Sequence, residues 1–179
     1  MGIPTLISTA TASGAANVSI TSGIDSTYNE YMFVCTDVSP SADAKSFYGL
    51  FSADGGSNYN LTITNTMFQA HQEEDDSDTG LTYNTDADLA QSTNPITFTS
   101  SSGSGADESS AMIFHLFNPS NTTYVKHYFF TCNTYASNNV SRVVYGGGYI
   151  NTTSAVNAVK FYFQTESNID GVFQMYGIA

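Results

Sequence analysis

The C-terminal segment, residues 156–179, alternates between apolar and polar side chains with a period of two. Val159, Phe161 and Phe163 mark one run, and residues 172–177 mark another after the turn-forming residues 168–171. This spacing places the apolar side chains on one face of a β-strand. A hydrophobic strand at this position must pair inside a sheet or remain an exposed, adhesive edge. We therefore expect two strands joined by a turn, with the last one closing the core.

The same period recurs along most of the chain. Strands are predicted at residues 28–38, 46–52, 59–70, 96–99, 111–117, 124–133 and 142–150. The glycine-containing turn at 53–59 predicts that residues 46–70 form a β-hairpin, and residues 118–123 predict a second hairpin turn. The three glycines at 146–148 predict a bulge or a close backbone approach.

Composition supports the same fold class. The 12 Tyr and 12 Phe residues favour strands, and no segment has a convincing helical period. We predict an all-β fold, specifically an antiparallel β-sandwich with jelly-roll topology and an extended N-terminal arm. A chain of 179 residues lies within the usual range of one domain.

Residues 1–22 are small, polar and β-branched, and they permit two interpretations. They form either an extended arm that pairs with a neighbouring subunit, or an edge strand of the protein's own sheet. The predicted division is therefore residues 1–22 as arm or first strand and residues 23–179 as a single β-sandwich domain.

The net charge of −12 restricts the partners of the chain. It arises from 4 basic and 16 acidic residues. Such a charge opposes binding to nucleic acid and to anionic lipid, both of which attract basic patches. No apolar run approaches the roughly 20 residues of a membrane span, and the N-terminus does not resemble a signal peptide. We expect neither a nucleic-acid nor a membrane partner, and synthesis in a cytoplasm without export by the secretory route.

One run of acidic residues is a candidate metal site. Glu74, Asp76 and Asp78 alternate as in a calcium loop, but Thr79 and Thr85 stand where an EF-hand requires Gly and Glu. The pattern favours a solvated acidic loop and no cofactor, with an irregular Ca²⁺ site as the alternative.

The sequence contains no recognised catalytic motif. His115 lies in an apolar strand and is interpreted as a core histidine, whereas His127 is expected to face outward. No zinc-type His or Cys spacing and no Gly-x-Ser-x-Gly motif occurs, so we expect no enzymatic activity. Cys35 and Cys132 are interpreted as buried thiols, with a disulfide between them as the alternative.

Three segments carry a family resemblance. They are the aromatic strand Tyr28 to Val38, the segment LFSADGGSNY at 50–59, and VNAVKF at 156–161 together with GVFQMYGI at 171–178. These segments resemble a family of small virion structural proteins of tailed bacteriophages, especially marine ones, with S-x-D-G-G-x-x-[YF] and a closing V-N-A-[IV]-[RK]-F … G-x-F-x-[LM]-Y-G-I. Residues 166–168 read Glu-Ser-Asn where the family often has Ser-Gly-Asn. The matched residues belong to the fold, and no ligand site carries over.

The resemblance implies a virion component. The first expectation is a capsid decoration (cement) protein made in the host bacterial cytoplasm, which binds the major capsid protein on the outer capsid surface as a symmetric homo-oligomer, a trimer. The expected capsid-anchoring residues are Ile3, Pro4, Leu6 and Ile7. Deletion of residues 1–22 should then abolish capsid binding and leave the fold intact.

The alternative is a tail or fibre component that binds host-surface glycans. Exposed tyrosine rings suit sugar stacking, and the candidate residues are Tyr59, Tyr83 and Tyr135. The competing interpretation is that these tyrosines fill strand faces.

Overall fold

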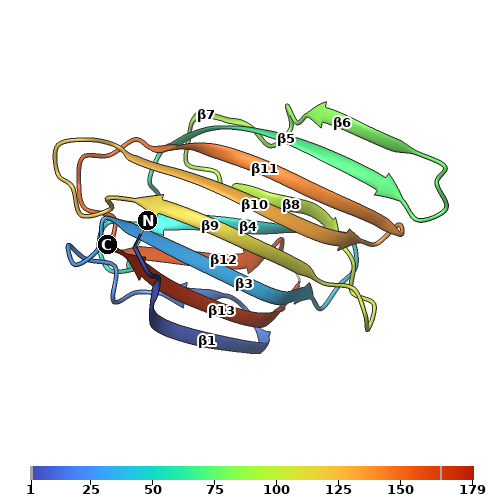
Figure 1. The fold of residues 1–179 in the computed structure, drawn as a ribbon, viewed down its shortest axis with the longest axis horizontal. Helices are drawn as coiled ribbons and strands as arrows, with labels where there is room; N and C mark the ends of the chain where they lie inside the picture. The colour runs from blue at the N-terminus through green and yellow to red at the C-terminus, as the bar shows by residue number, and fades with distance from the viewer. Residues whose placement is uncertain (1, 166) are drawn as a thin grey trace.

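The computed structural model describes residues 2–165 and 167–179. These residues form thirteen β-strands and no helix (Figure 1). The strands are β1 (Thr5–Ala15), β2 (Val18–Ile20), β3 (Glu30–Pro40), β4 (Lys45–Ser52), β5 (Ile63–Glu73), β6 (Thr79–Tyr83), β7 (Leu89–Ser92), β8 (Ile96–Ser102), β9 (Ser110–Phe117), β10 (Lys126–Ala136), β11 (Val140–Ile150), β12 (Ala158–Phe163) and β13 (Ile169–Ile178).

The strands form two antiparallel layers. The large sheet has the order β1-β13-β3-β9-β10-β11-β5, and both β6 and β7 pair with β5. The small sheet has the order β2-β12-β4-β8 and lies behind the large sheet in Figure 1. The described ladders connect the two sheets only through Ala136 and Ser102, at the end of β10 and β8. The all-β sandwich predicted from the sequence is confirmed.

Eight of the strands have the strand order of a jelly roll. In chain order these are β1, β2, β3, β4, β8, β9, β12 and β13. One sheet contains the first, eighth, third and sixth of these strands as successive neighbours, which is β1-β13-β3-β9. The other contains the second, seventh, fourth and fifth, which is β2-β12-β4-β8. Two insertions, β5–β7 and the β10–β11 hairpin, extend the large sheet beyond β9.

Phenylalanine rings from both sheets fill the interior. Phe33 and Phe114 of the large sheet face Phe161 and Phe98 of the small sheet, with ring centroids 5.9 Å apart in each pair. All four side chains are at most 1% exposed. Burial of a side chain of this size stabilises a fold by roughly 1.5–3 kcal/mol, so the alternating strands hold the two layers together.

The predicted hairpin turn at 118–123 is confirmed, since β9 pairs with β10. The hairpin predicted at 46–70 is wrong, and the two C-terminal strands do not pair with each other either, because the strands concerned belong to different sheets. Within residues 46–70, β4 pairs with β8 and β12, whereas β5 pairs with β11, β6 and β7. Likewise β12 pairs with β2 and β4, and β13 with β1 and β3. Alternation shows which face of a strand is buried, but a hairpin and a crossover between sheets have the same alternation. The prediction of a closing C-terminal strand is confirmed, since β13 lies between β1 and β3.

The N-terminal segment follows the second of its two interpretations. β1 is an edge strand of the large sheet, paired with β13, and β2 is an edge strand of the small sheet, paired with β12. Ala12, Val18 and Ile20 are buried in the core. Residues 5–20 are therefore part of the sandwich rather than a free arm.

The two cysteines are free and buried, so the alternative of a disulfide is wrong. Cys35 pairs with Met112 of β9, and Met112 pairs with Cys132 of β10. The thiols are thus two strand spacings apart, roughly 10 Å, which exceeds the separation that a disulfide can bridge. The glycines at 146–148 lie in an unbroken ladder rather than a bulge. They allow the predicted close approach, with the Phe130 ring packed over Gly146.

Candidate functional site

The four candidate anchoring residues do not share one environment. Ile3 is 90% exposed, Leu6 is 51% exposed and Pro4 is also exposed. Ile7 instead packs against the core. Because successive residues of a strand point to opposite faces, only part of this segment is accessible to a partner.

The candidate calcium ligands lie in the β5–β6 turn but do not converge. Asp78 Oδ2 is 3.1 Å from His71 Nε2, and Asp76 Oδ1 accepts a 3.0 Å hydrogen bond from Gln72. Hydrogen bonding to Glu74 raises the pKa of Tyr135. In residues 2–165 and 167–179, no three His, Cys, Asp or Glu side chains are grouped to hold a metal ion. The acidic residues of this turn are therefore used in separate local contacts.

The three candidate glycan-binding tyrosines lie in separate places. The ring of Tyr59 packs against the Lys160 ammonium, 4.0 Å from the ring centroid. Tyr83 lies on β6 and donates a 2.8 Å hydrogen bond to Asp88, whereas Tyr135 lies at the far end of β10 beside the β5–β6 turn. The structure does not bring the three rings into one site.

His115 is not a core histidine, contrary to the prediction. It lies on the outer face of the large sheet and is partly exposed. Its Nδ1 atom is 2.5 Å from Glu30 Oε1, and its ring stacks on Phe129 at 4.6 Å. His127 is exposed, as expected. The apolar neighbours of His115 in the sequence turn out to include outward-facing residues.

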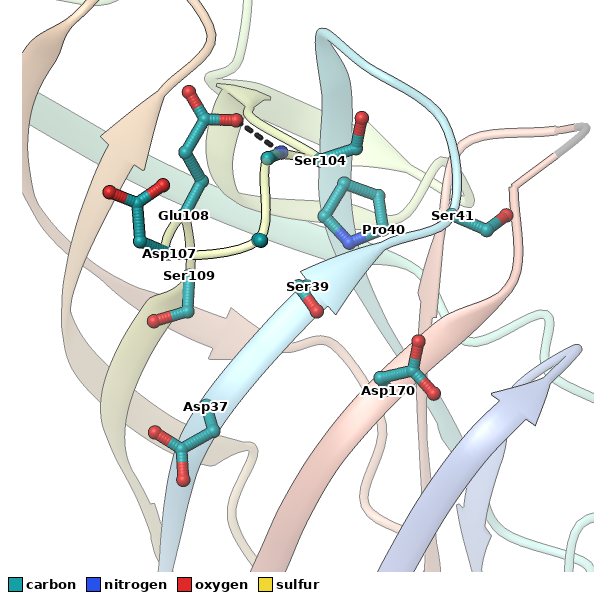
Figure 2. A pocket seen from close by; sticks show the side chains of 11 residues that line it. Asp37, Ser39, Pro40, Ser41, Ser104, Asp107, Glu108, Ser109 and Asp170 are labelled. Atoms are coloured by element: carbon teal, nitrogen blue, oxygen red, sulfur yellow. Dashed lines mark hydrogen bonds between the residues drawn. The ribbon is translucent and has the colours of Figure 1, made fainter.

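An acidic hollow of about 590 Å³ lies where β3 ends and β13 begins, beside the β8–β9 loop (Figure 2). Asp37, Asp107, Glu108 and Asp170 surround it. Glu108 accepts a 2.5 Å hydrogen bond from the Gly105 amide, and Figure 2 shows its carboxylate turned away from Asp37 and Asp170. The hollow can attract a cationic group electrostatically, but its carboxylates are spread around the rim.

The acidic residues concentrate at one end of the molecule. This acidic end is defined by ten of the Asp and Glu residues that the structure describes, which lie near the end of β3, in and beside the loops after β3, β5 and β8, and at the start of β13: Asp37, Asp43, Glu73, Glu74, Asp75, Asp76, Asp78, Asp107, Glu108 and Asp170. The loops that carry them contact one another, since the Ser104 amide donates to Asp43 and the Glu74 amide donates to the Asn139 carbonyl. Like-charge repulsion therefore disfavours close contact of two such ends.

The large sheet presents a row of exposed side chains, most of them apolar, across five of its strands. We define the aromatic face as the outward-facing residues Phe68, Tyr83, Ile113, Phe129 and Tyr145, which are each between 43% and 52% exposed. Ile113 faces Thr131, and Thr131 faces Tyr145 in the next strand. Tyr145 faces Phe68, and Phe68 faces Tyr83. The row thus runs from β9 to β6 through Thr131 of β10, and Phe129 lies two residues from Thr131 on the same strand. None of these residues is charged.

A groove of about 600 Å³ follows the aromatic face. Phe68 and Tyr145 are stacked on one side, with centroids 5.2 Å apart, and Phe129 lies on the other. Gly147 is opposite Phe129 and has no side chain to fill the space between them. The groove therefore exists because Gly147 has no side chain at this position between the aromatic rings.

Sequence reasoning missed the aromatic face, although a signal was present. The strands at 28–38 and 111–117 have apolar residues on both faces, and in 28–38 this pattern predicts a strand buried on both sides. In the structure only one face of each is buried, so that Met32, Val34 and Ile113 remain partly or largely accessible. A strand that is apolar on both faces thus indicates either a second covering layer or a contact surface.

Comparisons with known proteins add no identification. Neither the protein-family models, nor the curated proteins, nor the solved structures gave a significant match to this chain. No membrane-spanning helix is present in the described part of the chain.

Proposed function

We propose that this protein is a structural component of a bacteriophage particle, a decoration protein that binds the major capsid protein on the outer surface of the shell. The aromatic face is the observation that carries the proposal. Monomeric proteins seldom expose a continuous apolar surface of this kind, and such surfaces mark contacts with other proteins. The resemblance of the sequence to small virion proteins of tailed bacteriophages supplies the biological setting.

The charge distribution supports a large protein partner with an apolar contact and basic margins. The aromatic face has no charged residue, whereas the acidic end provides ten carboxylates at the edge of the same molecule. A shell surface with lysine or arginine at the border of an apolar patch would be complementary to both the aromatic face and the acidic end. The decoration protein would stabilise the shell because it binds the assembled state and not the free subunits.

We propose a symmetric homotrimer as the bound form. Symmetric oligomers match the local symmetry of a lattice and multiply each weak contact. Light scattering of the purified protein gives the mass of the free form, and a monomer both free and on the shell would remove this part of the proposal.

Binding to capsids that lack the protein tests the contact directly. The double variant Phe68→Ser/Tyr145→Ser removes the stacked pair of the aromatic face, and we expect at least about tenfold weaker co-sedimentation with capsids. The matched control is Tyr124→Ser, because Tyr124 is 69% exposed but lies in the β9–β10 loop. Unchanged sedimentation of the double variant would overturn the assignment of the aromatic face.

Copy number in purified particles separates a capsid position from a tail position. Quantitative mass spectrometry should give a ratio near stoichiometric with the shell protein, since only the capsid lattice repeats a site that often. A ratio of a few per cent would favour the tail or fibre alternative, and absence from the particle would contradict both.

A further inference from the structure

A second hollow, of about 490 Å³, lies at the end of the molecule opposite the acidic end. The β9–β10 loop, residues 118–125, forms most of its wall, and Thr153 of the β11–β12 connection completes it. We call this hollow the loop pocket. Its lining residues are Phe117, Asn118, Asn121, Thr123, Tyr124, Val125, His127 and Thr153.

The lining combines aromatic rings with uncharged hydrogen-bonding groups. Phe117 and the strongly exposed Tyr124 supply rings, and two asparagines, two threonines and His127 supply donors and acceptors. Within the described residues, the side chains of Asn118 and His127 make no hydrogen bond to the protein. No Asp, Glu, Lys or Arg lines the pocket, which distinguishes it from the acidic hollow of the same chain.

Hydrogen bonds fix the loop that presents Tyr124. Asn121 Oδ1 accepts from the amides of Thr123 and Tyr124, at 2.7 and 2.8 Å. These contacts leave the amide nitrogen of Asn121 free to donate elsewhere. The Val156 amide donates to the Pro119 carbonyl at 2.9 Å and attaches the loop to the connection before β12.

A buried lysine joins the two sides of the loop pocket. Lys126 is fully buried, and its ammonium donates to the Tyr124 carbonyl at 2.7 Å and to the Thr152 carbonyl at 3.2 Å. The residues beside these carbonyls, Tyr124 and Thr153, line the pocket. The lysine therefore holds both walls in position before any ligand arrives, which reduces the ordering that binding requires.

We propose that the loop pocket binds a neutral sugar residue, such as a hexopyranose unit of a surface polysaccharide. A sugar ring has an apolar face that packs on an aromatic ring and hydroxyl groups that pair with amides, hydroxyls and imidazole. The volume lies within the range of small-ligand pockets. The uncharged lining offers no partner to an ionic ligand, and the net charge of −12 repels an anionic one.

Saturation-transfer NMR with methyl glycosides tests the proposal on the full chain. The probes are methyl glycosides of glucose, galactose, mannose and N-acetylglucosamine, with glucuronic acid as the charged counterpart of glucose. We expect millimolar binding of at least one neutral glycoside and at least about tenfold weaker binding by Tyr124→Ala. The Phe68→Ser/Tyr145→Ser variant should bind the sugar as the wild type does, because its substitutions lie on the aromatic face.

The outcomes also separate this site from the proposed capsid contact. Loss of sugar binding in Tyr124→Ala with intact capsid binding supports the loop pocket. Absence of saturation transfer from every neutral glycoside, an undiminished signal in Tyr124→Ala, or equal binding of glucuronic acid and glucose would each overturn it. The NMR spectrum of each variant, compared with that of the wild type, shows that the fold is retained.

Discussion

The Nζ atom of Lys126 lies 2.7 Å from the carbonyl oxygen of Tyr124, although the lysine side chain has no exposed surface. Burial lowers the pKa of this ammonium. A lysine is seldom fully buried without a carboxylate partner, and here two backbone carbonyls take that role. One of the chain's 4 basic residues is thus committed to fixing two loops.

Replacement of this lysine should weaken the fold. We expect Lys126→Met to lower the free energy of unfolding by about 1–3 kcal/mol, because methionine fills the space but leaves the two carbonyls without donors. The matched control is Lys160→Met, since the Lys160 ammonium packs on the Tyr59 ring and its side chain is partly exposed. Urea denaturation measures both. Equal, small losses in the two variants would show that the Lys126 contacts contribute little.

The glycine run in β11 should respond differently at two adjacent positions. A Cβ atom at Gly148 would overlap the Thr64 carbonyl oxygen and lie 2.7 Å from Asn65 Cα, whereas the nearest atom at Gly147 is 3.3 Å away. We expect Gly148→Ala to lower the free energy of unfolding by about 1–3 kcal/mol, because backbone atoms must move. Gly147→Ala should change it by less than about 1 kcal/mol. Similar midpoints for the two variants in urea would contradict the packing described here.

The two cysteines should remain protonated and unreactive in the native protein. Burial raises the pKa of Cys132 from 9.0 to about 12 and also raises the pKa of Cys35. A thiol-specific reagent should therefore label neither residue at neutral pH until denaturant is added, when two thiols should react. Rapid labelling of the native protein would show that the core opens readily.

The same thiols give a pH dependence with a defined sign. Above pH 9 the unfolded chain releases its thiol protons while the native protein retains them, so the native state binds more protons. The stability that these thiols contribute is fully present below pH 9 and declines as the pH rises toward about 12. A Cys132→Ser variant should show a weaker decline in thermal melting temperature over this interval.

Deletion of the N-terminal segment is expected to damage the fold, contrary to the earlier expectation that the fold would survive. Residues 2–15 include β1 and the buried Ala12, and Ile7 packs on the core. Their removal should lower the free energy of unfolding by at least about 2 kcal/mol, measured in urea.

A point substitution separates anchoring from folding. Ile3→Asp changes a residue that is 90% exposed, so it should alter stability by less than about 0.5 kcal/mol. Loss of capsid co-sedimentation in this variant would support anchoring by the N-terminus, and unchanged sedimentation would contradict it. The result for Phe68→Ser/Tyr145→Ser shows whether the aromatic face acts in addition.

Candidate sites were predicted less well than strands, because a site depends on which loops meet. The acidic alternation at 74–78 suggested ligands of one ion, but Asp76 and Asp78 have separate partners in the folded turn. Tyr124 was not singled out, since its position opposite Thr153 depends on Lys126 and on the crossover from β11 to β12. The spacing of residues within one segment does not show which other loop lies beside it in the folded protein.

The sequence by itself determined the all-β class and the buried faces of its strands. Alternation is a local property, and burial of residues such as Phe161 and Phe173 follows directly from it. Tertiary structure decided that β12 and β13 lie in different sheets and that one apolar face, around Phe68 and Tyr145, remains uncovered. The reason is physical: a side chain's face is set by its own strand, whereas sheet partners and exposure are set by segments far away in the chain.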